Sequence, residues 1–374
     1  MPQANFPEMT KVRDPWIDNV KAFAILCVII GHSIGLLADK PNSMQLAGSW
    51  IVAFNMPLFV LMAGWTAQRG FERIVNWSSL LVFFEKLVER LVIPSVVFSA
   101  LYPIARGEFL SRHLWLIYFS LIVIYYLSKR IKDVIPGRWL FPIRAFLVAA
   151  LVVLSFPINY YWFLIMIIQY QIILGLISFI FQKLNWSGIW DLGIRLAVFC
   201  LIVLAFCSSW TKEFVFYCVL GLLFHKLELK NTFTMLPSWL FVIALILIIP
   251  SVQYVSDYDF YQHGVSSLVL NGKWWIFLLR QMNGIILSLV IIRCVIALSK
   301  RYNEISRFGS FSMALYMLHT QILAIYPISF EGSSTYKGWL YLLVIVCVWT
   351  AISYGIILCL NKWFLPRKLF LGKD

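Results

Sequence analysis

Charged residues are scarce in this sequence. They make up only 13% of its 374 residues, whereas 61% of the residues are hydrophobic and the mean hydropathy is +0.83. A water-soluble domain carries far more charge than this, so the composition excludes one. It predicts instead a polytopic membrane protein with short loops, embedded in a lipid bilayer.

Acidic residues are the rarer charged class, because 17 Asp and Glu stand against 31 Lys and Arg, which gives a net charge of +14. Such an excess can indicate a nucleic-acid-binding protein. Here, however, the basic residues lie between apolar segments, where they determine the topology of a membrane protein. We therefore expect no nucleic acid among the partners.

Cysteines with the spacing of metal ligands are missing. All seven cysteines lie inside apolar segments, so we expect buried packing residues, no metal site and no disulfide. The sequence also lacks a cleavable signal peptide, an obvious internal repeat and a low-complexity linker. These absences predict a single membrane domain over residues 1–374.

Long apolar runs are abundant. We expect each to be helical, because a spanning backbone must satisfy its hydrogen bonds internally. Residues 113–128, 140–156 and 212–226 are short or marginal for about 30 Å of hydrocarbon. The sequence thus predicts an all-α transmembrane helix bundle with 10–12 spans. The twelve segments are 17–38, 49–67, 80–105, 113–128, 140–156, 160–182, 190–209, 212–226, 238–255, 274–298, 309–328 and 337–361.

The distribution of Lys and Arg predicts the orientation of the bundle. With twelve spans and an internal N-terminus, 24 of the 31 Lys and Arg fall on the cytoplasmic side and seven on the outer side. Loops rich in Lys and Arg stay in the cytoplasm. We therefore expect both termini to be cytoplasmic.

Polar residues of the first segment share one helix face. Asp18, Lys21 and His32 are joined by steps of three and four residues, and Lys21 lies about 16 Å from His32 along the axis. This face presents charge at the membrane surface and an imidazole deep in the bundle. An ionisable group inside a span indicates a functional site, and a histidine satisfied by its neighbours is the equal alternative.

Two further polar residues fall at depth. Asn55 lies at the predicted level of His32, where its amide can orient the imidazole or bond a neighbouring helix, and both roles stay open. His319 falls near the middle of the membrane in the segment 309–328, where it must face protein or water.

Residues near the outer side are candidates for contact with an acceptor. Arg280 lies about a turn and a half inside the segment 274–298, where it can snorkel outward or bind an anionic or sugar group. Tyr161 and Trp162 begin the segment 160–182, and they are typical of interfacial aromatics or of residues that stack on a sugar ring.

Basic residues gather near the cytoplasmic ends of the second and third segments, at Arg69, Arg73 and Arg90. Clustered guanidinium groups are what a nucleotide phosphate needs. Glu85 and Glu89 offer the alternative, because they can pair with these bases along the helix and make the cluster structural.

Together these motifs resemble integral-membrane acyltransferase family 3, which includes bacterial O-acetyltransferases of surface polysaccharides. The basic residue eleven positions before the first histidine is the most specific of them. The motifs stand at residues 17–21 (IDNVK), 31–33 (GHS), 54–59 (FNMPLF) with Gly64, 90–94 (RLVIP), 162–164 (WFL) and 312–319 (SMALYMLH).

The resemblance implies a fold with ten core spans and an acyl-CoA-dependent O-acyltransferase. Its donor would be cytoplasmic acyl-CoA, usually acetyl-CoA, as a co-substrate with no permanently bound cofactor. Its acceptor would be a hydroxyl of a glycan. It makes His32 essential with Lys21 as its basic companion. It also places Arg69 and Arg73 in the donor site, although three residues separate them here where members commonly have two. Asn55 stands where many members have histidine.

Residue chemistry agrees with this activity. A neutral imidazole can remove the proton of a hydroxyl as it attacks a thioester, so we expect His32, with Asn55, to be catalytic, and an acyl-histidine is the variant. Arg90 would extend the donor site of Lys21 and the two arginines. The acceptor or pore-lining residues would be Asp18, Trp162, Arg280 and His319. We expect the protein in the bacterial cytoplasmic (inner) membrane, with partners in polysaccharide assembly.

A secondary transporter or flippase for a glycan-related solute is the alternative from another class. Twelve spans and intramembrane His and Arg suit such a carrier. An inverted repeat, or a matching pair of Gly/Pro-interrupted helices in the two halves, is not evident in the sequence.

Overall fold

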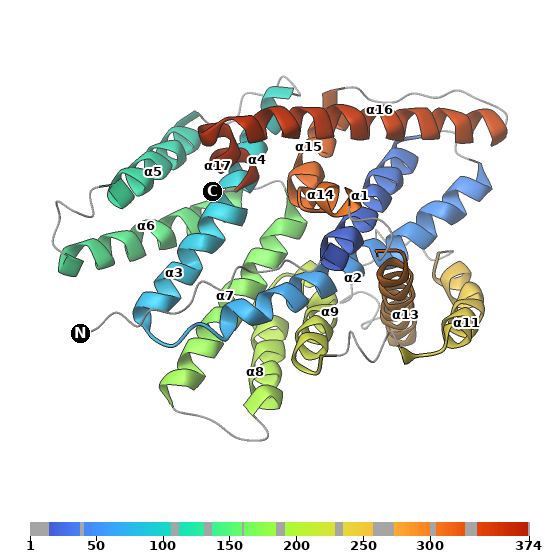
Figure 1. The fold of residues 1–374 in the computed structure, drawn as a ribbon, viewed down its shortest axis with the longest axis horizontal. Helices are drawn as coiled ribbons and strands as arrows, with labels where there is room; N and C mark the ends of the chain where they lie inside the picture. Colours follow the sequence, from blue (N-terminus) through green and yellow to red (C-terminus); the bar gives the residue numbers. More distant parts are fainter. Residues whose placement is uncertain are drawn as a thin grey trace.

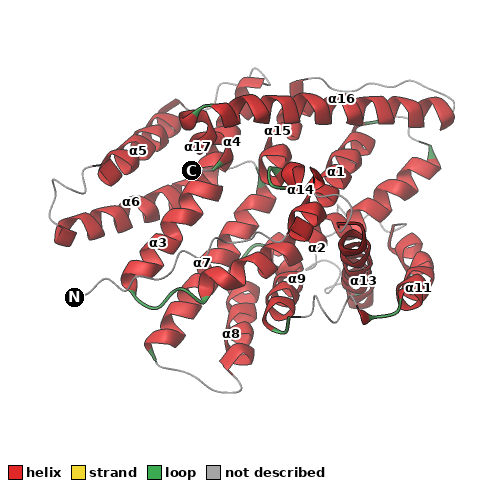
Figure 2. Ribbon diagram, viewed as in Figure 1, coloured by secondary structure: helices red, strands yellow, loops and turns green. Residues whose placement is uncertain are grey.

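The computed structural model describes residues 15–37, 41–105, 112–130, 137–158, 161–184, 191–228, 235–256, 273–299, 304–325 and 335–372. Within these residues every long element is a helix, as Figure 2 shows, which confirms the all-α prediction. The elements are α1 (Pro15–Leu36), α2 (Asn42–Phe71), α3 (Trp77–Leu87), the π-helical turn η1 (Val88–Val92), α4 (Ile93–Ala105), α5 (Arg112–Arg130), α6 (Gly137–Ile158), α7 (Trp162–Lys183), α8 (Asp191–Phe206), α9 (Ser209–Lys226), α11 (Ser238–Ser256), α13 (Trp274–Ser299), α14 (Glu304–Gly309), α15 (Ser312–Ile325), α16 (Thr335–Lys362) and α17 (Phe364–Leu371).

Six helices in the described part of the chain are long and apolar enough to cross a membrane, namely α1, α2, α7, α11, α13 and α16. All twelve predicted segments contain a helix, although residues 38, 160, 190 and 326–328 lie outside the described residues. Of the marginal segments, 140–156 forms a shorter apolar helix. The number of spans beyond six, and the side on which each terminus lies, stay predictions.

The predicted segment 80–105 is not one regular helix, because η1 separates α3 from α4. Pro94 is the second residue after this turn. It has no backbone N–H, and its ring clashes with the carbonyl four residues earlier in a regular α-helix. A π-turn inserts one extra residue and relieves that conflict. It also changes the direction in which the side chains of η1 point.

The predicted segment 309–328 is broken as well. Gly309 ends α14, and residues 310–311 form a turn before α15 begins. A Cβ atom at Gly309 would collide with the backbone carbonyl of Asp18 and would meet the nitrogen of Ala22. The end of α14 therefore lies directly on the backbone of α1, which only glycine permits.

α2 and α9 approach each other as closely, through a glycine on each helix. A Cβ at Gly64 would collide with the carbonyl of Cys218, and one at Gly221 would collide with the carbonyl of Leu61. Small residues let helix backbones come together in a membrane, where packing rather than water exclusion holds helices to one another. The two helices thus form one closely packed pair.

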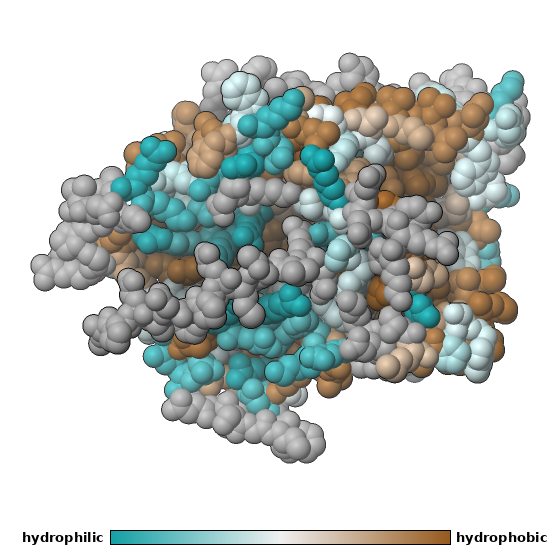
Figure 3. All heavy atoms as spheres, viewed as in Figure 1, coloured by the Kyte–Doolittle hydropathy of each residue, from teal (hydrophilic) through white to brown (hydrophobic). Residues whose placement is uncertain are grey.

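Figure 1 shows how these helices are arranged. α1 and α2 lie in the middle, with α11 and α13 on the right and α5 and α6 on the left, and α16 runs along the upper edge. The main apolar core draws most of its buried side chains from α1, α2, α7, α9 and α15. In Figure 3, hydrophobic residues cover the upper right, where α16 lies, and hydrophilic side chains gather toward the left and centre.

Candidate functional site

Two histidines meet inside the bundle. The Nδ1 atom of His32 on α1 and the Nε2 atom of His319 on α15 are 2.9 Å apart. The two rings stack with centroids 5.0 Å apart and planes 25° apart. His319 is fully buried, and His32 is partly buried. The sequence predicted each imidazole at depth, and the structure brings them into direct contact.

The hydrogen bonds assign the tautomers of this pair. The Nδ1 atom of His319 lies 3.0 Å from the carbonyl oxygen of Leu315, which can only accept, so this nitrogen carries the hydrogen. In the neutral ring Nε2 is then an acceptor, and the Nδ1–H of His32 donates to it. The Nε2 atom of His32 is left with its lone pair. The geometry therefore leaves the lone pair of the His32 Nε2 atom unused by His319.

The helix α15 is fixed on both sides of His319. The hydroxyl of Tyr161 donates to the carbonyl of Met317 at 2.9 Å. The amide of Gln321 donates to the Tyr161 hydroxyl oxygen at 2.6 Å and to the carbonyl of Phe98 at 2.9 Å. These bonds join α15 to α4 and to Tyr161, the residue that directly precedes α7. Tyr161 is buried, so it is not an interfacial aromatic.

Asn55 lies buried in α2, where its side-chain oxygen accepts the backbone N–H of Met56 at 2.6 Å. Among the described residues, the hydrogen-bond partner of the His32 ring is His319 and not Asn55. A catalytic role for Asn55 stays a prediction. The residue that sequence reasoning did not pair with His32 is the one that orients it.

A row of aromatic rings leads from the histidine pair to the beginning of α9. Consecutive ring centroids lie 5.5–6.2 Å apart, and the row draws on α15, α7 and α9 in turn. Trp162 is its exposed member, at 38% exposure. In order the rings are His319, Tyr316, Phe163, Trp162 and Phe214.

Arg280 on α13 stands at the far end of this row, with its guanidinium 6.0 Å from the ring of Phe214. It forms an ion pair with Glu213 on α9, whose side chain is only 3% exposed. Arg280 therefore does not snorkel outward, because its charge is held inside the bundle by a carboxylate. Glu213 was missed, although an ionisable residue in the apolar segment 212–226 was the signal for it.

The predicted donor residues lie at helix ends. Asp18 is buried and Lys21 partly buried in the first turns of α1. Arg69 and Arg73 are exposed at the end of α2 and just beyond it, and Arg90 is exposed on η1. The structure gives these three arginines the exposure that phosphate binding requires, and their role stays a prediction.

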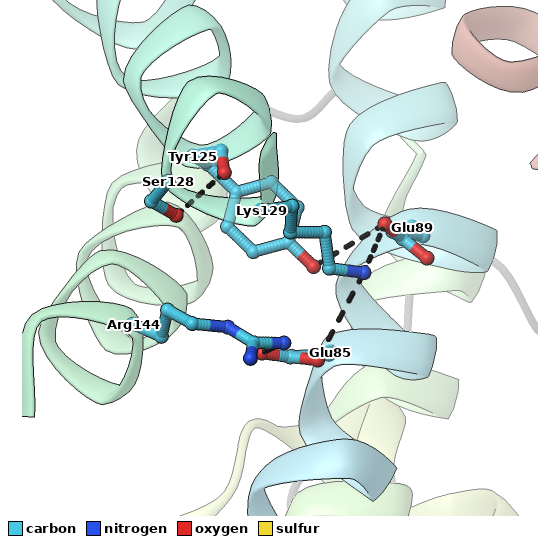
Figure 4. Close-up of polar contacts among 6 residues, drawn as sticks. All are labelled: Glu85, Glu89, Tyr125, Ser128, Lys129 and Arg144. Carbon is cyan, nitrogen blue, oxygen red and sulfur yellow. Dashed lines mark hydrogen bonds and ion pairs between the residues drawn. The ribbon is translucent and has the colours of Figure 1, made fainter. Parts of the chain in front are cut away.

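Glu85 and Glu89 do not take these arginines as their described partners. As Figure 4 shows, Glu89 accepts a hydrogen bond from Lys129 of α5 at 2.7 Å, and Glu85 pairs with Arg144 of α6. Lys129 also lies 3.8 Å from Glu85. These partners do not support the alternative in which the two glutamates pair with bases of their own helix. Their partners come from helices for which local spacing gives no signal.

Within the described residues, no group of three or more His, Cys, Asp or Glu is placed to hold a metal ion.

Residues 14–358 match the model of the acyltransferase 3 family, described as an acyltransferase domain. Comparisons with curated proteins and with solved structures find no match. Since the family match covers most of the chain, and several helices can cross a membrane, the chain belongs to the acyltransferase 3 family and is a multi-pass membrane acyltransferase that uses an acyl donor.

Proposed function

We propose that this protein transfers an acyl group from cytoplasmic acyl-CoA to a hydroxyl of a surface polysaccharide or of a lipid-linked glycan. The acyl group that we expect is acetyl. The observation that carries the proposal is the hydrogen-bonded pair of His32 and His319 inside an acyltransferase domain. In this proposal the protein acts as one membrane domain over residues 1–374. It lies in the bacterial cytoplasmic membrane, together with partners in polysaccharide assembly.

The reaction follows from the tautomers. The Nε2 atom of His32 removes the proton of the acceptor hydroxyl, and the oxygen attacks the thioester carbonyl carbon. As the carbon–sulfur bond breaks, His32 gives this proton to the departing thiolate of CoA. His319 accepts the Nδ1–H of His32 throughout, so it keeps the ring in the orientation that exposes Nε2.

Donor and acceptor would reach this base from opposite ends of the bundle. The exposed guanidinium groups of Arg69, Arg73 and Arg90, with Lys21, would hold the phosphates of CoA at one end. Asp18 would line the path between. Trp162 and Arg280 lie with the aromatic row that ends at His319, and they would contact the acceptor.

The experiment measures transfer of radiolabelled acetyl from acetyl-CoA by the purified protein in nanodiscs. His32→Ala should reduce transfer by at least about 10²-fold, because it removes the general base. The matched control is Ser33→Ala, since the Ser33 hydroxyl bonds only its own helix, at the carbonyl of Ile29 and 2.8 Å away. Equal transfer by wild type and His32→Ala contradicts the proposal.

The covalent variant has its own readout. Wild-type protein incubated with labelled donor and no acceptor should carry no label on His32 if transfer is direct. Label that remains bound to the protein after removal of the donor would instead establish an acyl-histidine intermediate.

A further inference from the structure

Gln281 directly follows Arg280 in α13, and its side chain is buried, at 7% exposure. Among the described residues, neither its amide nitrogen nor its amide oxygen has a hydrogen-bond partner. An unsatisfied amide inside a protein is costly, and more so at membrane depth, so its retention indicates a ligand that completes it.

The position of Gln281 is well defined by its neighbours. The hydroxyl of Tyr217 on α9 donates to the backbone carbonyl of Gln281 at 3.2 Å. Three residues further along the same face, Gly284 lies against Tyr217 and against Pro57 of α2. The amide thus belongs to the face of α13 that packs on α9 and α2. Tyr217 lies about one turn along α9 from Glu213, and its ring is 6.0 Å from that of Phe214.

The charge of the group is balanced. Arg280 alone would attract an anion, but Glu213 already occupies its guanidinium as a buried partner. A bound carboxylate or phosphate would have to compete with that carboxylate, and it would also be repelled by it. A neutral ligand with several hydroxyls meets no such barrier, because hydroxyls can both donate to and accept from an amide.

We infer that Gln281, the pair of Glu213 and Arg280, and the exposed ring of Trp162 form the acceptor subsite, and that it takes a neutral sugar. This inference rests on the proposed transferase function. The Trp162 ring covers the apolar face of the sugar, and the amide of Gln281 bonds its hydroxyls. The aromatic row then leads from Trp162 toward the histidine pair.

Transfer kinetics test the inference with defined probes. We expect wild-type protein to acylate a neutral hexose trisaccharide with a KM at least about tenfold lower than that for the matching hexuronic acid trisaccharide. Gln281→Leu should raise the KM for the neutral trisaccharide about tenfold and leave the KM for acetyl-CoA unchanged. Its Tm should stay equal or rise, because the substitution removes an unsatisfied buried amide.

The control is Ser155→Ala. Ser155 is buried in α6, and its hydroxyl donates to the carbonyl of Val152 in the same helix at 2.7 Å. This variant should leave both KM values unchanged. If Gln281 were only a structural residue, Gln281→Leu would lower the Tm and leave the KM for the trisaccharide as it is, which overturns the inference. A preference for the hexuronic acid trisaccharide overturns it as well.

Failure of the inference and failure of the proposed function give different results. Wild-type protein whose Tm does not respond to acetyl-CoA contradicts the proposed function. Protein that is stabilised by acetyl-CoA, yet neither acylates the neutral trisaccharide nor gains Tm from it, overturns the acceptor subsite alone.

Discussion

At the residue scale, the bond between His32 and His319 makes a specific prediction about His319. It is a positioning residue, because it acts on the reaction through the ring of His32. His319→Leu removes the acceptor of the His32 Nδ1–H, so the ring loses its fixed tautomer and kcat should fall about 10²-fold. His319→Gln keeps an oxygen acceptor and should recover part of that loss.

The measurement is kcat for labelled acetyl transfer, with the Tm of each variant as the control for folding. A structural role alone would make the two substitutions equally active at equal Tm. That result would contradict the assignment of the tautomers.

The pair of Arg280 and Glu213 predicts a stability effect at the same scale. Arg280→Leu leaves a buried carboxylate without its partner and should destabilise the protein by about 3–5 kcal/mol. The double variant Arg280→Leu/Glu213→Leu removes both charges and should recover most of this loss. Thermal unfolding in detergent micelles measures both, and a double variant no more stable than the single one contradicts the prediction.

At the scale of helices, the contact of α14 with α1 depends on one missing Cβ atom. Gly309→Ala pushes α14 from the carbonyl of Asp18, so it should destabilise the fold by about 1–3 kcal/mol and shift α15, with His319, away from His32. Gly355→Ala on α16 is the matched control, since nothing lies within 4 Å of the added atom.

Thermal unfolding and acetyl transfer are measured together for this pair of variants. Gly355→Ala should be neutral or slightly stabilising, as an alanine is in a helix interior. Two equally stable and equally active variants would show that the contact at Gly309 does not position α15.

Helices were predictable from the sequence because the membrane imposes them. Long apolar runs have no other way to satisfy their backbone, so all twelve segments appear as helices. The breaks at η1 and Gly309 were harder to predict. Pro94 lies in the middle of the predicted segment 80–105, but a proline there can kink one continuous helix as well as end it. Gly309 is critical only because another backbone lies against it.

The sequence predicts how deep the residues of the candidate site lie in the bundle. It does not predict which of these residues contact one another. Apolar flanks place His32 and His319 within the bundle, but 287 residues separate them and no local spacing links them. The same holds for Glu85 with Arg144 and for Glu213 with Arg280. Steps of three and four residues indicate neighbours on one helix, whereas these contacts depend on which helices pack together.

At the scale of the whole molecule, the excess of Lys and Arg on one side predicts that both termini are cytoplasmic. A reporter that fluoresces only in the cytoplasm should be active when it is fused after Asp374, and alkaline phosphatase at the same place should be inactive. Alkaline phosphatase inserted after Lys40, in a predicted outer loop, should be active. The reverse pattern contradicts the orientation, and with it the side from which acyl-CoA enters.

The glycines that join α2 to α9 limit how this protein can move. Gly64 and Gly221 bring the two backbones into contact, so neither helix can tilt against the other without a steric clash. We expect α2 and α9 to stay together as one rigid unit during the catalytic cycle. An opening that admits the two substrates must then form elsewhere, for example where α13 packs on α2 and α9 through side chains such as Tyr217.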